Sequence, residues 1–227
     1  MQEDMIQLRR LELIPTVFFI SAFVLMCTLG TWQLQRLAWK KNILMETEKV
    51  QNLPALVSLP QDISDLTYRK VALTGEFLHD HTFHLIGRQQ GVDMGFYMLT
   101  PLELKGDGRI ILVNRGFSPL GKESKPEGLV RVEGSLRPVR EKRYFVPENM
   151  PEKNVWTHED LNKIGELIGK TPLPLIVEAI GTQQKDIFPI PSDGKVIFRN
   201  DHLGYAFTWY ALALTSLVMF AVYYRKK

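Results

Sequence analysis

One histidine stands where a long uncharged stretch begins near the C-terminal end of the chain. His202 directly precedes residues 203–224, which contain no Asp, Glu, Lys, Arg or His. In a helix, Trp209 falls within about 40° of His202 and Tyr205 about 60° away. A neutral imidazole flanked by aromatic rings has the chemistry to ligate a haem iron while the rings hold the porphyrin. The alternative is a boundary histidine that is solvated or caps the helix, beside ordinary interfacial aromatics.

The same uncharged stretch also carries a face of small residues. Small side chains let membrane helices pack closely. If this face meets the small residues of the N-terminal uncharged stretch, the face with His202 and Trp209 points away from the partner helix. That face would then meet lipid, a ligand or another membrane protein. The hypothesis concerns Gly204, Thr208, Ala211 and Thr215 in the C-terminal stretch, and Cys27, Gly30 and Thr31 in the N-terminal one.

Three further histidines lie close together and raise the question of a metal site. In an extended strand His79 and His81 would share one face, and His84 would lie on the other. A turn at Asp80 would gather all three imidazoles into a candidate copper site. The other interpretation is an exposed polar turn between strands. The sequence leaves both open.

An arginine ends the most apolar run of the central region. Arg115 follows residues 110–113, and an arginine that enters a core needs a carboxylate partner or loop carbonyls to cap. Gly116 beside it suits a β-bulge. The chain has no Ser-His-Asp order, paired carboxylates in a recognisable frame, glycine-rich phosphate loop or CxxC motif. We therefore predict that it is not an enzyme.

Two stretches meet the length requirement for crossing a membrane. Residues 13–34 and 203–224 are each 22 residues long and free of Asp, Glu, Lys, Arg and His. A helix of that length reaches roughly 33 Å, and a hydrocarbon core is about 30 Å thick. Inside lipid the backbone must satisfy its own hydrogen bonds, so both stretches should be helices. The single cysteine, Cys27, lies in the first, which excludes an intramolecular disulfide.

The charges at the two ends predict an orientation. Arg9 and Arg10 precede the first span, and residues 225–227 are all cationic. Short positive flanks favour the cytoplasm. We therefore expect residues 1–12 and 225–227 to be cytoplasmic and residues 35–202 to be periplasmic, in a bacterial inner membrane. The formal net charge is +3 and no basic stripe is present, so a nucleic-acid partner is not expected.

The segment between the spans has the period-2 pattern of β-strands, as in the alternation around Val71 and Leu73. Short connections between the runs favour antiparallel pairing. One helix is predicted after the capping pair Thr157 and Asp160, and the first span is expected to continue as a helix through residues 36–49. The predicted strands are residues 69–78, 82–88, 96–104, 109–117, 129–136, 175–180 and 195–199.

These patterns together predict the fold class. Two transmembrane α-helices should flank a mainly antiparallel β domain of α+β type, with a barrel-like or sandwich-like sheet. No break between the predicted strands is long enough to be a linker, so residues 35–202 should form one domain.

Several short motifs occur in a fixed order along the chain. They are Leu29-Gly30-Thr31-Trp32-Gln33-Leu34-Gln35-Arg36 with Lys40, Gly95 with Thr100-Pro101-Leu102, Val113-Asn114-Arg115-Gly116-Phe117, Val132-Glu133-Gly134, and His202-Leu203 with Tyr205-Ala206, Thr208-Trp209-Tyr210 and Leu212-Ala213. In this order between two spans, they make the chain resemble the Surfeit locus protein family of cytochrome c oxidase assembly factors over nearly its whole length. Phe117 departs from the family pattern, which often has tryptophan at this position.

The resemblance implies a bacterial assembly factor that assists the insertion of haem a into subunit I of the oxidase. It makes His202 the axial ligand of the haem iron, with Tyr205 and Trp209 as neighbouring contacts. Implied partners are cytochrome c oxidase subunit I, haem a synthase and membrane lipid. It gives Gly30, Trp32 and Arg36, at the outer end of the first span, a role in positioning the spans or in contacting haem propionates. Arg115 is expected to have a structural or partner-facing role.

Two alternative functions stay open. One is a membrane scaffold without a cofactor that stabilises subunit I during assembly. The other is a copper carrier that uses His79, His81 and His84.

Overall fold

The structure is a computed structural model that describes residues 2–88, 94–119, 124–140, 142, 144–181, 187–194 and 200–225. The chain divides into two compact units. The first comprises Met1–Glu46 with Ile197–Lys227, and the second comprises Thr47–Val196.

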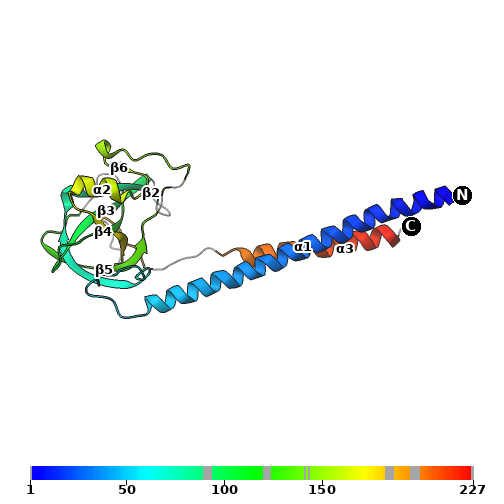
Figure 1. Ribbon diagram of the computed structural model, residues 1–227, viewed down its shortest axis with the longest axis horizontal. Coiled ribbons are helices and arrows are strands. Elements are labelled where there is room, and N and C mark those ends of the chain that lie inside the picture. Colours follow the sequence, from blue (N-terminus) through cyan, green and yellow to red (C-terminus); the bar gives the residue numbers. More distant parts are fainter. Residues whose placement is uncertain are drawn as a thin grey trace. The chain divides into compact units, whose positions relative to one another are not determined.

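The first unit contains two long apolar helices, α1 (Gln2–Gln51) and α3 (His202–Arg225), which lie side by side (Figure 1). Both contain segments long and apolar enough to cross a membrane. The prediction of two apolar helices is confirmed. The predicted continuation of the first helix is also confirmed, because residues 36–49 contain no glycine or proline and α1 ends only at Gln51.

Helix α3 packs against α1 through one narrow face. Ala206 and Ala213 are each 2% exposed, and Ser216 is 7% exposed. The Ser216 Oγ donates a hydrogen bond of 3.4 Å to the carbonyl oxygen of Phe19. The Phe19 ring also contacts Phe220, with ring centroids 5.9 Å apart. His202 and Trp209 share the direction of this face and are half-buried.

The hypothesis that the other small-residue face of α3 meets α1 is wrong. Gly204, Thr208, Ala211 and Thr215 are all exposed, and a Cβ added at Gly204 would meet nothing within 4 Å. On the α1 side the expectation was sound, because Gly30 packs against the ring of Tyr210. The reason for the error is that α3 has small side chains on two different faces. The buried one recurs at spacings of 7 and 3 residues, the repeat of a left-handed helix pair.

Chemical crosslinking should report this packing directly. In a Cys27→Ser background, the pair Phe19→Cys and Ser216→Cys should react with a short bifunctional thiol reagent to give an internally linked chain. The matched pair Phe19→Cys and Thr215→Cys places the second thiol on the exposed face, and it should remain unlinked. Mass spectrometry after proteolysis identifies the linked pair. The reverse pattern would mean that α3 packs on α1 through the face that contains Thr215.

The second unit is a mixed five-stranded β-barrel. The strand order β1-β5-β7-β4-β3 closes on itself because β1 also pairs with β3. Most pairs are antiparallel, but β4 with β7 and β2 with β6 are parallel. The strands are β1 (Lys70–Phe77), β2 (Phe83–Arg88), β3 (Met94–Leu104), β4 (Ile110–Pro119), β5 (Leu129–Pro138), β6 (Val155–Trp156) and β7 (Pro172–Ala179).

The predicted strands agree with six of these elements within a few residues, and the barrel-like alternative is the one observed. The seventh predicted strand, residues 195–199, lies outside the described residues. Among its described residues the unit also has three short helical elements: η1 (His79–His81), η2 (Pro151–Lys153) and α2 (Leu161–Ile168).

The predicted start of α2 needs correction. Asp160 is the N-cap, and its side chain accepts a 3.0 Å hydrogen bond from the Lys163 amide. Thr157 lies outside the helix and instead donates its hydroxyl to the carbonyl of Pro147, 2.6 Å away. The Thr157–Asp160 pair is therefore not a capping box, because its second member is itself the cap.

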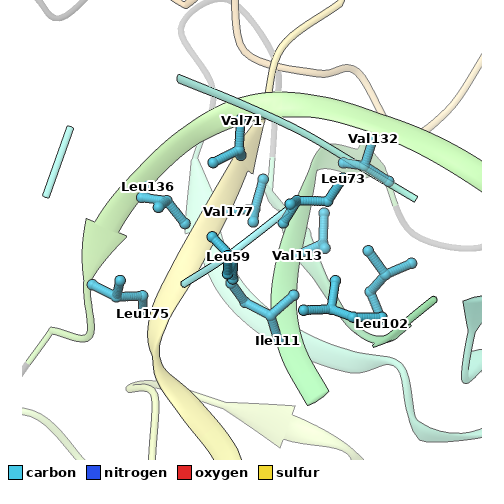
Figure 2. Close-up of a cluster of buried hydrophobic side chains, with 11 residues drawn as sticks. Leu59, Val71, Leu73, Leu102, Ile111, Val113, Val132, Leu136, Leu175 and Val177 are labelled. Atoms are coloured by element: carbon cyan, nitrogen blue, oxygen red, sulfur yellow. The ribbon is translucent and has the colours of Figure 1, made fainter. Parts of the chain in front are cut away.

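The barrel encloses a core of branched aliphatic side chains (Figure 2). Ile111 and Val113 of β4 point into it, while Leu112 between them packs in a second cluster with Trp156 and with Ile164 of α2. Strand β4 is thus buried on both faces, which explains why it reads as an unbroken apolar run. The enclosed cluster comprises Leu59, Val71, Leu73, Leu102, Leu104, Ile111, Val113, Val132, Leu136, Leu175 and Val177.

Gly116 is required by a β-bulge in β4, as expected from the sequence. Tyr97 pairs with Phe117 and Leu99 with Asn114, so one residue of β3 faces two of β4. Gly116 has a φ of +117°, and a Cβ there would lie 1.9 Å from the carbonyl oxygen of Ile190.

Gly116→Ala should destabilise the second unit. Backbone strain alone should cost about 1–3 kcal/mol, and the new methyl group must also displace Ile190. Gly128→Ala is the control, because Gly128 also has a positive φ of +69° but has open space around its Cβ. Denaturant unfolding, followed by the fluorescence of Trp156 with the other three tryptophans replaced by phenylalanine, should show the larger loss for Gly116. Equal losses would mean that the contact with Ile190 does not matter.

A buried ionic network stabilises one side of the barrel. Arg137 binds Glu159 through two hydrogen bonds of 2.6 and 2.8 Å and also contacts Glu178. The side chains of Arg137 and Glu159 are only 11% and 1% exposed. Burial alone would lower the pKa of Arg137, but hydrogen bonds and charge from the two carboxylates more than offset it and raise the pKa above its ordinary value.

Candidate functional site

His202 is the first residue of α3 and is hydrogen-bonded to α1. Its Nδ1 lies 2.7 Å from Oε1 of Gln33. An amide oxygen only accepts hydrogen bonds, so Nδ1 is the donor in this contact, and in the neutral imidazole Nε2 then keeps its lone pair. Within the described part of the chain, the imidazole has no other polar partner. The ring is half-buried, and Nε2 of the neutral ring can still bind a metal ion.

Several contacts fix the register of α1 against α3. The hydroxyls of Thr31 and Tyr210 are 2.9 Å apart. A Cβ on Gly30 would lie 2.9 Å from the Tyr210 ring, so the glycine permits the close approach. Thr16 and Tyr224 contact each other through their hydroxyls further along. Residue numbers fall on one helix as they rise on the other, so the helices are antiparallel.

This register places further side chains at the level of His202. Trp32 and Arg36 lie within one turn of Gln33 on α1, and Tyr205 lies within one turn of His202 on α3. The Arg36 guanidinium lies over the Trp39 ring, 5.0 Å from its centroid, and 5.7 Å from that of Trp32. Trp32 and Tyr205 are 46% and 57% exposed. The layer thus combines an imidazole, a cation and exposed aromatic surface.

Trp209 differs from Tyr205 in its position. It lies two turns from His202, roughly 10.5 Å along the helix axis. It is half-buried, between the buried residues Ala206 and Ala213 on the same face. The structure therefore brings Tyr205, Trp32 and Arg36 to the level of His202, while Trp209 lies deeper along the helix pair.

Gln33 is the residue that the sequence analysis missed. It lies within one of the motifs on which the family resemblance depends, between Trp32 and Arg36. Nothing in the sequence connects it with His202, which is 169 positions away. Only the register of the helix pair reveals the contact.

Arg115 lies in the second unit and is 8% exposed. It donates a hydrogen bond to the carbonyl of Ser124, and its guanidinium lies 5.2 Å from the centroid of the Phe77 ring. The sequence analysis offered either a carboxylate partner or a loop carbonyl for Arg115, and the structure shows a loop carbonyl. The side chain also borders a pocket of about 270 Å³ that is otherwise mainly apolar.

The three clustered histidines have separate environments. His79 and His81 lie in η1, and Nε2 of His79 is 2.7 Å from the Pro126 carbonyl oxygen. The His84 ring stacks on Phe96, with centroids 5.2 Å apart. Among the described residues, no group of three or more His, Cys, Asp or Glu side chains is arranged to hold a metal ion.

Comparison with known proteins gives a consistent result. The SURF1 family model matches residues 20–214. A SURF1-like protein of Rickettsia bellii is 34% identical over 219 residues, covering 91% of this chain and 89% of that protein. A SURF1-like protein of Monosiga brevicollis is 33% identical, with 92% and 86% covered. Human Surfeit locus protein 1 is 34% identical, with 87% and 73% covered.

The family match spans both the helix pair and the barrel. It includes Gln33 and His202, whose contact joins the two apolar helices. The chain therefore belongs to the SURF1 family, which is known as a family of cytochrome c oxidase assembly factors.

Proposed function

We propose that this protein binds haem a transiently through Nε2 of His202 and assists its insertion into subunit I of cytochrome c oxidase. The observation that supports this most is the 2.7 Å contact of His202 Nδ1 with Gln33. In the neutral ring this contact leaves the opposite nitrogen with its lone pair and without a partner among the described residues, which is the state that a haem ligand requires.

The surrounding side chains suit a porphyrin with carboxylate substituents. Trp32 and Tyr205 offer exposed aromatic surface, and Arg36 supplies a guanidinium that can pair with a propionate. Trp209 is a more distant contact. A single protein ligand to the iron also suits a delivery role, because cargo that is to be transferred must dissociate.

The proposed location is a bacterial inner membrane with both termini in the cytoplasm. The structure supports placing both termini on one side of the membrane, because the N- and C-termini lie at the same end of the helix pair (Figure 1). The cationic flanks at residues 9–10 and 225–227 favour the cytoplasmic side for that end. His202, at the opposite end of α3, then lies at the periplasmic boundary.

A cofactor-free scaffold for subunit I is the second candidate, and one observation favours it. The small-residue face of α3 is exposed rather than packed on α1. Such a face permits close packing with a helix of another membrane protein. The face comprises Gly204, Thr208, Ala211 and Thr215.

A deletion strain should distinguish delivery from scaffolding. If the protein delivers haem a, newly made subunit I should accumulate with a lower ratio of haem a to polypeptide shortly after induction. If it is only a scaffold, the amount of subunit I should fall while that ratio stays unchanged. Pulse-labelled subunit I and extracted haem a give both quantities, and the unmodified gene should restore them.

A further inference from the structure

The contact between Gln33 and His202 joins residues 169 positions apart and lies where α3 begins. We propose that Gln33 is a positioning residue, which holds the His202 ring in one tautomer and one orientation so that Nε2 faces an incoming haem iron. This inference rests on the proposed function, because it assigns the role of Gln33 toward the same cargo.

The geometry makes Gln33 a hydrogen-bond acceptor for the imidazole. Its Oε1 lies 2.7 Å from Nδ1 of His202, a normal length for a strong N–H···O bond. A neutral imidazole whose Nδ1–H is held in this way cannot move its proton to Nε2 without losing the hydrogen bond. The ring therefore presents the lone pair of Nε2.

The packing of the helix pair holds the acceptor in place. Gly30 and Thr31, within one turn of Gln33, contact Tyr210 of α3, and the Thr31 and Tyr210 hydroxyls are 2.9 Å apart. This contact fixes both the distance and the register of the two helices. The side chain of Gln33 is itself half-buried, so its range of rotamers is restricted.

The chemical type of the acceptor matters for a protein that must release its cargo. A hydrogen bond to the non-ligating nitrogen fixes the tautomer and raises the basicity of the ligating one, and its loss typically costs about 10–100-fold in metal affinity. A carboxylate at position 33 would raise that basicity further, because it carries a full negative charge. A neutral amide orients the ring while leaving the iron–imidazole bond weak enough to break.

The first test needs no haem. Full-length protein labelled with ¹⁵N-histidine, at a pH where imidazole is neutral, should show an unprotonated Nε2 and a protonated Nδ1 for His202, assigned by comparison with His202→Ala. In Gln33→Leu the signals should move toward the opposite tautomer. Gln35→Leu is the matched control, since Gln35 is exposed on the same helix, and it should leave the signals unchanged. An unchanged tautomer in Gln33→Leu would overturn the inference.

The second test measures haem a affinity and release. Gln33→Leu should weaken binding by roughly 10–100-fold, Gln35→Leu should not, and Gln33→Glu should tighten binding and slow release. A merely structural role for Gln33 would weaken binding in both Gln33 variants. If His202→Ala loses haem while Gln33→Leu binds normally, only this inference fails. If His202→Ala binds haem normally, the proposed function fails, and the tautomer measurement still decides whether Gln33 orients the ring.

Discussion

His202→Ala should abolish the retention of haem a by the purified full-length protein. The substitution removes the nitrogen that is proposed to bind the iron, so the loss of affinity should exceed the roughly 10–100-fold expected when only a supporting hydrogen bond is lost. When the variant is expressed in the deletion strain, the ratio of haem a to subunit I should stay as low as in the deletion strain alone. Absorption spectra of the purified protein and haem extraction from membranes measure the two effects.

The matched control replaces the histidines of the barrel domain. His79→Ala, His81→Ala and His84→Ala together remove the candidate copper ligands, and none of them belongs to the helix pair. The combined variant should retain haem a and support oxidase assembly. Failure of the triple variant, with normal function of His202→Ala, would favour the copper-carrier alternative.

Arg137→Met should strongly destabilise the barrel domain. It leaves the Glu159 carboxylate, whose side chain is 1% exposed, without its cationic partner. Breaking a buried ion pair by removing one member typically costs about 3–5 kcal/mol. Glu178 loses a contact with the same guanidinium. Denaturant unfolding of the full-length protein in detergent measures the free energy of unfolding, read from Trp156 fluorescence in the background in which the other three tryptophans are phenylalanine.

Two further variants separate the buried charge from the loss of a side chain. Adding Glu159→Met to Arg137→Met should recover much of the stability, because no uncompensated charge then remains at position 159. Lys163→Ala breaks an exposed ion pair with Glu166 and should leave the free energy of unfolding nearly unchanged. A double variant that is as unstable as Arg137→Met would show that the charge on Glu159 is not the cause.

Local patterns predicted most of the barrel because its strands obey simple rules. Val71 and Leu73 face the enclosed core, and their neighbours in β1 alternate with them. Strand β4 lacks alternation, yet its glycine still indicated the bulge. Parallel pairing of β4 with β7 could not be predicted, because it depends on contacts between strands that are far apart in sequence.

The packing of the helix pair was beyond prediction for a different reason. Helix α3 has small residues on two faces, and both satisfy the spacing that allows close approach. The choice depends on larger neighbours, such as Phe220 against Phe19 and Tyr210 against Gly30. Gln33 followed from that choice, because only the observed register puts its amide beside the imidazole of His202.

The most direct measurement is pulsed electron paramagnetic resonance on the haem-loaded, full-length protein with ¹⁵N-histidine. A ¹⁵N hyperfine coupling to the haem iron should be present, and it should disappear in His202→Ala while persisting in the triple variant at positions 79, 81 and 84. A coupling that is absent from the unmodified protein, or that survives in His202→Ala, would contradict the role assigned to His202.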